Sequence, residues 1–263
     1  MNQKKKIAFI ILFIMITMCV VPFTSKSVEA AAKTAITKQT GYTIDQDALR
    51  KLMCKKLGTP YRKMDCSGYA AWVLEHLGEK GARENAVKDV KIVSGHSTYV
   101  WKRSGKLKIS YKPAVYSKTK QKWVWGKREK IAVNKGLITW KSSKKANRKA
   151  AGNLKVGDAL LYKNPEHIAY YFGEFSSIKK VAAYLKNNCG MKKLKKSRTA
   201  AGNVCYKYKG KIVLIQYAGC GTQWRIHASS SYGVVIDNDL TFHNGAYGGK
   251  WYGKVGVVNT AAE

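Results

Sequence analysis

The sequence predicts an α+β domain in which a cysteine at a helix N-terminus packs on an antiparallel sheet, with two basic insertions. Three observations carry this prediction: a helical pattern that begins at Cys66, a strand–loop–strand pattern over residues 159–172, and two lysine-rich stretches. The chain has 263 residues, and removing the first 30 leaves about 233. That length is sufficient for one sizeable domain that carries insertions.

Residues 1–30 are typical of an export signal. Lys4, Lys5 and Lys6 form a positive start, residues 7–21 are apolar, and Ala30 ends a small-residue cleavage site. We therefore expect a secreted protein of the bacterial cell wall or extracellular space, which contacts the membrane only through the signal segment before cleavage. Residues 31–42 are expected to be a short leader, and residues 43–263 a single domain.

The net charge narrows the range of partners. It is +34 for the whole chain and +31 without residues 1–30, because that segment holds four lysines and one glutamate. A charge of this size binds polyanions without specificity. In an exported protein, anionic wall polymers or a membrane surface are better partners than nucleic acid, so no nucleic-acid partner is expected. A general composition bias of the organism is the alternative explanation.

The basic residues concentrate in two inserts, at about 102–153 and 174–222. In the first insert Glu129 is the only acidic residue, and tyrosines and tryptophans alternate with lysines. Such mixtures can bind nucleic acid or sugar rings. The lysines and aromatic residues can also be the solvated and buried faces of the same strands. We favour this second interpretation for most of them.

An odd number of cysteines remains after removal of the signal, so full pairing is impossible. If Cys66 is the free thiol, four others allow at most two bridges in any of three pairings: Cys54, Cys189, Cys205 and Cys220. Three of these four lie between positions 189 and 220, where a local disulfide would be short. The sequence leaves the pairing open.

The segment Asp65-Cys66-Ser67-Gly68 follows a turn-prone stretch and leads into a helix. Tyr69, Val73 and Leu77 fall at i, i+4 and i+8, which predicts one buried stripe. Cys66 therefore lies at or just before the first helical turn, where unpaired N–H groups and the helix dipole favour a thiolate. A thiolate can attack carbonyl groups. A small buried structural cysteine is the alternative.

Other patterns predict the remaining elements. Thr43 and Gln46 form a capping-box pattern for a helix that ends near Leu57. Shorter signals predict a helix from 97, strands at 106–111 and 122–125, and a hairpin of 159–162 and 167–172 with a four-residue loop. Farther along the chain they predict a helix at 178–185, a strand at 212–217, a strand–turn–strand of 223–230 and 232–237, and a last strand at 250–258.

The histidines differ in context. The strand period of two places His167 on one face with Ala169 and Tyr171, so His167 can either cap a core edge or project into a site. We interpret the others outside the motifs as structural or surface residues: His76, His96 and His243. No CxxC or HExxH pattern and no phosphate-binding glycine loop occurs, so neither a metal nor a cofactor is expected.

Four blocks in order resemble the NlpC family of papain-like bacterial cell-wall cysteine peptidases. The blocks are Gly58-Thr-Pro-Tyr…Asp-Cys-Ser-Gly68, Leu154-Lys-Val-Gly-Asp-Ala-Leu-Leu-Tyr162, His167-Ile-Ala-Tyr-Tyr-Phe-Gly173 and Ile226-His-Ala-Ser…Gly-Val-Val-Ile236. The resemblance covers most of residues 43–258, in blocks separated by the two inserts. It implies a papain-like fold with the nucleophile on a helix and its partners on adjacent strands.

The resemblance also implies catalytic roles. Cys66 would be the nucleophile, His167 the general base, and His227 the residue that orients His167. These roles match the chemistry that such a triad requires, since a base must take the thiol proton and return it to the leaving amine. The backbone N–H of Cys66, at a helix N-terminus, would be a ready oxyanion donor.

Three further residues match the family pattern around the substrate and oxyanion: Tyr61, Asp65 and Ser67. Two departures accompany the match. The two histidines are 60 positions apart, much farther than the family pattern, so the segment between them must loop out or another polar residue must replace His227. Only three residues separate Tyr61 from Asp65, without the usual glycines, which shortens one wall of the cleft.

The resemblance implies a secreted cysteine endopeptidase that hydrolyses peptidoglycan stem peptides, at the amide between D-glutamate and the diamino acid, through a thioester. We expect a monomer that its basic inserts hold against anionic wall polymer. An acyl or amide transferase with the same Cys/His/His site is one alternative. A non-catalytic basic binder of wall polymer is the other.

Overall fold

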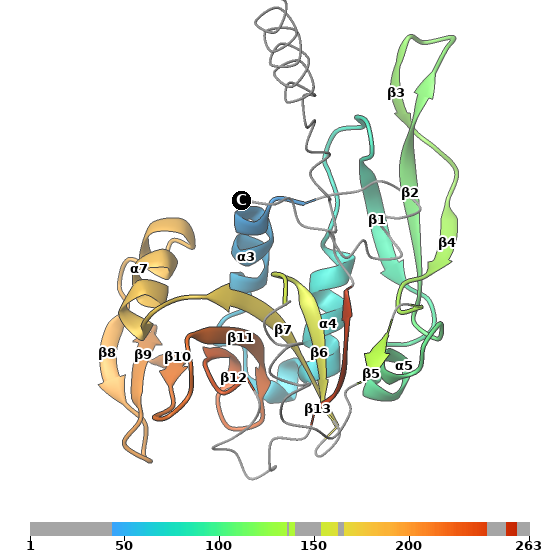
Figure 1. Ribbon diagram of the computed structural model, residues 1–263. Helices are drawn as coiled ribbons and strands as arrows, with labels where there is room; N and C mark the ends of the chain where they lie inside the picture. Colours follow the sequence, from blue (N-terminus) through green and yellow to red (C-terminus); the bar gives the residue numbers. More distant parts are fainter. Residues whose placement is uncertain (1–43, 136, 140–153, 163–165, 241–250, 257–263) are drawn as a thin grey trace, which may run out of the picture. The chain divides into compact units, whose positions relative to one another are not determined.

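The chain divides into two units, residues 1–31 and 32–263. The computed structural model describes residues 44–135, 137–139, 154–162, 166–240 and 251–256, all in the second unit (Figure 1). This unit is α+β, with largely antiparallel sheets and few helices, so the predicted fold class is confirmed at that level. The expected signal segment, the leader and His243 lie outside the described residues. None of the described helices has the length and apolar composition needed to cross a bilayer.

The larger sheet has nine strands and carries the candidate site. Their order is β5 (Ile138–Thr139), β13 (Trp251–Gly256), β6 (Asp158–Tyr162), β7 (His167–Glu174), β11 (Gln223–Ser229), β12 (Gly233–Asp237), β10 (Lys211–Gln216), β9 (Val204–Tyr208) and β8 (Lys195–Arg198). All described neighbours pair antiparallel except β10 and β12, which are parallel. The predicted hairpin is confirmed, because Tyr162 pairs with His167 across residues 163–166.

The first basic insert contributes to a smaller sheet. Its strand β2 (Lys108–Ser117) pairs with β1 (Val87–Ile92), β3 (Lys122–Trp125) and β4 (Glu129–Ala132). Ile109 and Tyr111 of β2 are buried, whereas Tyr116 is 53% exposed and meets Trp123 edge-on. The aromatic residues of β2 therefore divide between a buried and a solvated face, as expected for most of them.

The second insert loops out between the two strands that carry the histidines, as the sequence required, because β7 and β11 pair directly across it. Between β7 and β11 the chain forms α7 (Ile178–Asn188) and then β8, β9 and β10, which extend the same sheet beyond β12. Val181 and Leu185 of α7 are buried in the main core. The insert is therefore part of the domain, and β7 and β11 pair as direct neighbours.

Two of the described α-helices come before the first strand in the chain, and a third follows β1. The first, α3 (Gln46–Cys54), begins at Asp45, whose carboxylate accepts a hydrogen bond from the N–H of Ala48 at 2.8 Å. The predicted Thr43 cap was therefore wrong, because Asp45 is the side chain that satisfies the first turn. The second, α4 (Cys66–Glu75), and the third, α5 (Thr98–Lys102), begin where the sequence predicted.

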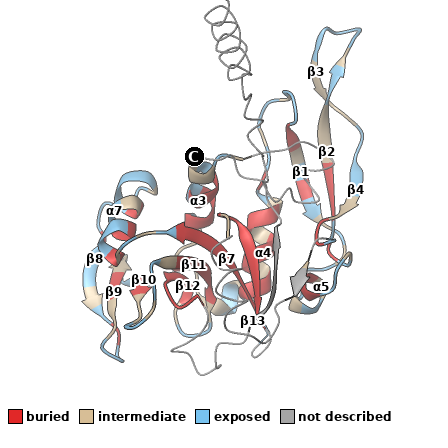
Figure 2. Cartoon of the chain, viewed as in Figure 1, coloured by how far each residue is buried: buried red, intermediate tan, exposed pale blue. Residues whose placement is uncertain are grey.

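The helix α4 packs on β7 and β11 of the larger sheet and on β1 of the smaller one. Its Tyr69 and Val73 are fully buried, as the predicted stripe requires, and the Tyr170 hydroxyl of β7 donates to the carbonyl of Ala70 at 2.8 Å. Figure 2 shows the strands β6 and β7 buried along most of their length. Burial of each large apolar side chain contributes ~1.5–3 kcal/mol, so this contact holds α4 firmly on the sheet.

The five cysteines of the described residues are all free thiols: Cys54, Cys66, Cys189, Cys205 and Cys220. The local disulfide that the sequence allowed between positions 189 and 220 is thus not formed. Instead, Cys54 on α3 and Cys189 at the end of α7 share a side-chain hydrogen bond. This contact joins the second insert to the first helix.

Candidate functional site

Cys66 is the first residue of α4, and local hydrogen bonds place it there. The carboxylate of Asp65 caps the helix by accepting from the N–H of Gly68 at 2.6 Å and from the Ser67 hydroxyl at 3.0 Å. A Cβ atom on Gly68 would lie 3.1 Å from the same carboxylate oxygen, so glycine suits the close approach. The motif Asp-Cys-Ser-Gly is therefore a capped helix start that presents Cys66 in the first turn.

The thiol of Cys66 does not favour the thiolate at rest. Cys66 is only 5% exposed, and this burial raises the pKa of its thiol, with the Asp65 carboxylate adding to the rise. Hydrogen bonds from the backbone N–H groups of Ile168 and Ser67 and from the Tyr61 side chain act in the opposite direction but do not outweigh burial. Burial therefore opposes the thiolate that the helix position alone was expected to favour.

The same contacts locate the sulfur beside the start of β7. Its hydrogen-bond partner Ile168 directly follows His167, and Tyr61 comes from the short 3₁₀ helix η1 (Tyr61–Lys63) that precedes α4. Tyr61 thus contacts Cys66 directly, and His167 is the chain neighbour of the Ile168 backbone that contacts the thiol.

His167 and His227 form a buried pair on neighbouring strands. Nε2 of His167 lies 2.7 Å from Nδ1 of His227, and the rings meet edge to face with centroids 4.8 Å apart. Nε2 of His227 lies 2.9 Å from a carboxylate oxygen of Asp237 on β12. Three side chains from three adjacent strands thus form one hydrogen-bonded chain.

The charge of Asp237 determines which nitrogen carries each proton. Burial alone would raise the pKa of this carboxyl, but the Arg225 guanidinium and His227 hold it well below its usual range. An ionised carboxylate only accepts, so Nε2 of His227 donates and its Nδ1 accepts. Nε2 of His167 must then donate, which leaves the lone pair of His167 on Nδ1. That is the tautomer of a general base.

Both imidazoles are neutral at neutral pH. Burial lowers the pKa of His167 well below its ordinary value, with the neighbouring His227 and Arg225 contributing in the same direction. Burial and Arg225 also lower the pKa of His227, although Asp237 opposes them. The resting site therefore contains a neutral thiol and a neutral base rather than a preformed ion pair.

Arg225 holds the Asp237 carboxylate in position. It is 1% exposed, lies directly opposite Asp237 in the β11–β12 register, and binds both carboxylate oxygens, at 2.8 and 3.2 Å. Its Nη1 also donates to the Tyr162 hydroxyl at 3.1 Å, and that hydroxyl donates to the carbonyl of Leu240 at 2.8 Å. A bidentate pair of this kind fixes the carboxylate geometrically as well as electrically.

Sequence reasoning missed Arg225 and Asp237. A signal for them existed: Arg225 is two positions before His227 and so shares its strand face, and Asp237 ends the apolar run of β12. Charged residues at inward positions of buried strands are rare unless paired. Their pairing with each other, however, depends on the strand register.

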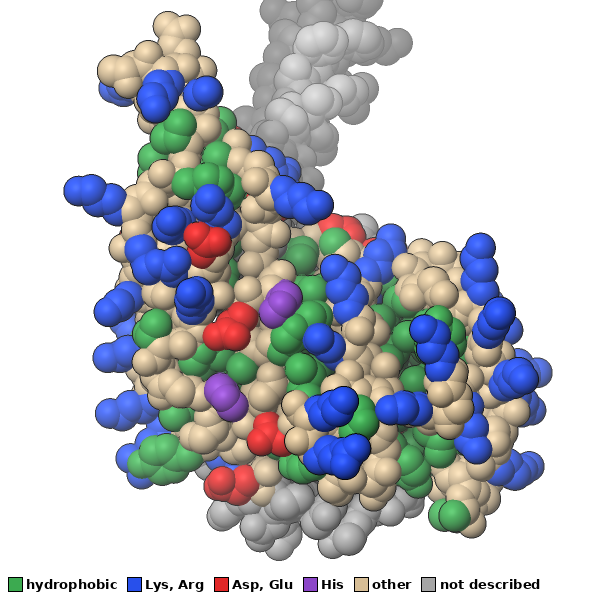
Figure 3. Space-filling model, turned by 180° about the vertical axis from the view of Figure 1, so that it is seen from behind, with side chains coloured by type: hydrophobic (Ala, Val, Ile, Leu, Met, Phe, Trp, Pro, Cys, Tyr) green, Lys and Arg blue, Asp and Glu red, His purple; other side chains and the backbone are tan. Residues whose placement is uncertain are grey.

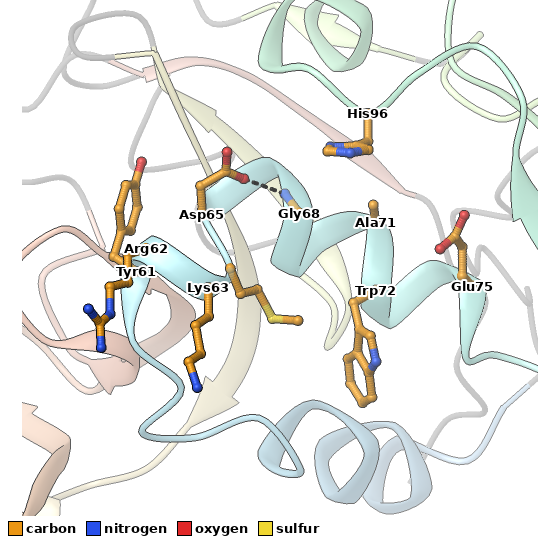
Figure 4. A pocket seen from close by; sticks show the side chains of 10 residues that line it. Tyr61, Arg62, Lys63, Asp65, Gly68, Ala71, Trp72, Glu75 and His96 are labelled. Carbon is orange, nitrogen blue, oxygen red and sulfur yellow. Dashed lines mark hydrogen bonds between the residues drawn. The ribbon is translucent and has the colours of Figure 1, made fainter.

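The two remaining predicted residues do not join the histidine chain: Asp65 lines a neighbouring cleft, and Ser67 is buried beside it. A cleft of about 600 Å³ runs along α4 past Tyr61, Asp65 and Trp72 (Figure 4). His96, interpreted from sequence as a surface residue, is exposed but also lines this cleft, with Nδ1 3.5 Å from the Ser67 hydroxyl. His76 stacks on Trp72 away from the histidine chain.

A second cleft, of about 520 Å³, meets the first at Tyr61 and Arg62. The described residues contain no cluster of three or more histidine, cysteine or acidic side chains arranged to hold a metal ion. Comparisons with protein-family models, with curated proteins and with solved structures find no match to this chain.

Proposed function

We propose that this chain is a secreted cysteine endopeptidase with a papain-like arrangement, related to the NlpC family, that hydrolyses peptidoglycan stem peptides. The favoured bond is the amide between D-glutamate and the diamino acid. The observation that carries the proposal is the buried chain His167–His227–Asp237 ending beside the capped helix start of Cys66. A structural cysteine would not require an oriented and correctly protonated base next to it.

The mechanism follows from the resting protonation states. As the sulfur of Cys66 attacks the amide carbon, Nδ1 of His167 takes the thiol proton, and the carbonyl oxygen becomes an oxyanion. The N–H of Cys66, at the start of α4, and the Tyr61 side chain are the nearby donors for this oxyanion. A neutral pair must transfer the proton during attack, so His167 acts as a true general base.

In the second half of the reaction, His167 gives up the proton that it took from the thiol. The imidazolium of His167 donates its proton to the leaving amine, the C–N bond breaks, and a thioester to Cys66 remains. Water then attacks the thioester while His167 takes a proton from it, which releases the carboxylic acid and restores the thiol. Asp237 stabilises the imidazolium through His227, since it supplies a fixed negative charge at the end of the chain.

The basic surface supports a wall polymer as the partner that holds the enzyme near its substrate. Figure 3 shows lysine and arginine side chains spread over this face, with few acidic groups among them. Exposed lysines occur on strands of both inserts, such as Lys108 on β2 and Lys195 on β8. Binding of this kind depends on ionic strength, because exposed charges are screened by salt.

The test is lysis of purified peptidoglycan by the mature protein. The variants Cys66→Ala and Cys66→Ser should abolish lysis without loss of folding, whereas Cys220→Ala, on the loop between β10 and β11, should leave it intact. Retained lysis in both Cys66 variants would eliminate the proposal. Mass spectrometry of the products with an added acceptor amine separates hydrolysis from acyl transfer, since a transferase would yield the amine adduct.

A further inference from the structure

The second cleft adjoins the first, with which it shares lining residues. Its walls come from the turn before η1, the β9–β10 hairpin of the second insert, and the β11–β12 turn at residues 230–233. Two of its lining residues, Tyr61 and Arg62, also line the first cleft. Cys66 does not itself line this cleft, but Tyr61, which does, makes a side-chain hydrogen bond to the Cys66 thiol, so one residue links the cleft to the candidate nucleophile.

Its charge differs from that of the first cleft. The first combines the carboxylates of Asp65 and Glu75 with the cations Arg62 and Lys63, whereas the second includes three cations and no acidic residue: Arg62, Lys207 and Lys211. Among the ion pairs of the described residues, none involves any of these three. Three cations converging on one concavity without a carboxylate attract an anion.

The walls of this cleft are held in place by the backbone. The N–H of Gly58 donates to the carbonyl of Val234 at 2.8 Å, and the N–H of Val234 donates to the carbonyl of Thr59 at 2.9 Å. Gly233 has φ +73° and lies so close to Thr59 that a Cβ would overlap the Thr59 carbonyl oxygen. The cleft is thus built before any ligand arrives, which reduces the ordering cost of binding.

We infer that this second cleft is a carboxylate subsite, in which Lys207 and Lys211 of the second insert, with Arg62, bind a free carboxylate of the residue next to the scissile amide. The inference rests on the proposed function. A γ-linked D-glutamyl residue keeps its α-carboxylate free, and a diamino acid also carries a carboxylate beside its linking amine. Either group has the charge and position that the cleft accepts, and charge-assisted hydrogen bonds to it would fix the substrate.

The experiment compares three soluble stem peptides: one with all carboxylates free, one amidated at the D-glutamyl α-carboxylate, and one amidated at the diamino acid. The enzyme is the full mature chain as wild type, as Lys207→Gln/Lys211→Gln, and as the control Lys209→Gln. Lys209 is in the same hairpin but does not line the cleft. KM is measured for each, and the Kd of each peptide is measured by calorimetry on the Cys66→Ala background.

The double variant should raise KM and Kd for the free peptide about tenfold, as expected for loss of one or two charge-assisted contacts. The double variant should not change KM or Kd for the peptide in which amidation has removed the carboxylate that the subsite binds. The peptide that is unaffected therefore identifies which carboxylate is bound. Lys209→Gln should leave all values unchanged. Equal weakening of all three peptides, or equal effects of Lys209→Gln, would overturn the subsite. If the wild-type protein hydrolyses none of the peptides, the proposed function is wrong. The Kd values do not depend on hydrolysis, so they would still show whether the second cleft binds a carboxylate.

Discussion

Nε2 of His167 and Nδ1 of His227 lie 2.7 Å apart, although 60 residues separate the two histidines in the chain. The contact exists because β7 and β11 are direct neighbours in the sheet, with the second insert folded beyond β12. It makes the role of His227 directly testable.

Replacing His227 with alanine should lower kcat/KM by about 100-fold or more with little change in KM, because His167 loses the acceptor that fixes its tautomer. His227→Asn should recover part of the loss, since an amide oxygen can accept from Nε2 of His167. Steady-state kinetics on a soluble stem peptide provide the measurement. If alanine and asparagine are equally impaired, or neither is, His227 does not orient the base.

Asp237→Asn should affect both stability and activity. The variant leaves the buried guanidinium of Arg225 without its counter-charge, which costs about 3–5 kcal/mol of unfolding free energy. It also removes the charge that orients His227, so kcat should fall about 100- to 10,000-fold. Urea unfolding and kinetics measure the two effects.

A double variant, Arg225→Met/Asp237→Leu, separates these effects. Replacing both charges with apolar groups should restore most of the stability, because no uncompensated buried charge remains. Activity should stay low, since His227 still lacks its anionic partner. Recovery of activity together with stability would show that Asp237 acts only through the fold.

Stability should fall as the solution becomes acidic. The folded pKa values of His167 and His227 are lowered, so below the unfolded value of about 6.5 the unfolded chain binds more protons than the folded one. Asp237 acts in the same direction below about 4, because its folded pKa is also lowered. The unfolding free energy, measured by urea between pH 7.5 and 4, should therefore decrease steadily. The decrease between pH 6.5 and 5 should be smaller in His227→Asn, and an unchanged slope would contradict the assignment.

The thiol of Cys66 should react slowly with iodoacetamide at neutral pH, since burial raises its pKa. Alkylation should increase with pH beyond the range of an ordinary cysteine, while peptide hydrolysis still proceeds at neutral pH through His167. Mass spectrometry of Cys66 modification over a pH series tests this. Rapid modification near pH 5 that disappears in His167→Ala would instead indicate a thiolate–imidazolium pair.

Gly233→Ala should destabilise the protein by about 3 kcal/mol or more, because it adds both backbone strain and an overlap with the Thr59 carbonyl. Gly202→Ala is the matched control: its φ is +80°, but nothing lies within 4 Å of its added Cβ. The control should lose only about 1 kcal/mol. Equal losses of stability in the two variants, measured by thermal or urea unfolding, would show that the close contact with Thr59 does not contribute to the cost of the substitution.

Much of the local structure follows from sequence patterns alone. The helix start at Cys66, the hairpin with a four-residue loop before His167, and the short helix after Ser97 all depend on neighbouring residues, so local periodicity and capping predicted them. The choice of Cys66, His167 and His227 as the candidate site came from the resemblance of short sequence blocks to those of the NlpC family. The predicted cap at Thr43 was wrong, because Asp45, the residue directly before the helix, accepts the hydrogen bond from its first turn.

Only the tertiary structure decided how these parts combine. The position of the second insert in the sheet, the pairing of Arg225 with Asp237, and the protonation order along the histidines depend on strand order and register, which no local pattern contains. The resting state of Cys66 likewise depends on how much of the chain covers it. The sequence by itself determined which side chains are offered for chemistry, and long-range packing determined their partners and their charge, because burial and distance are properties of the assembled sheet.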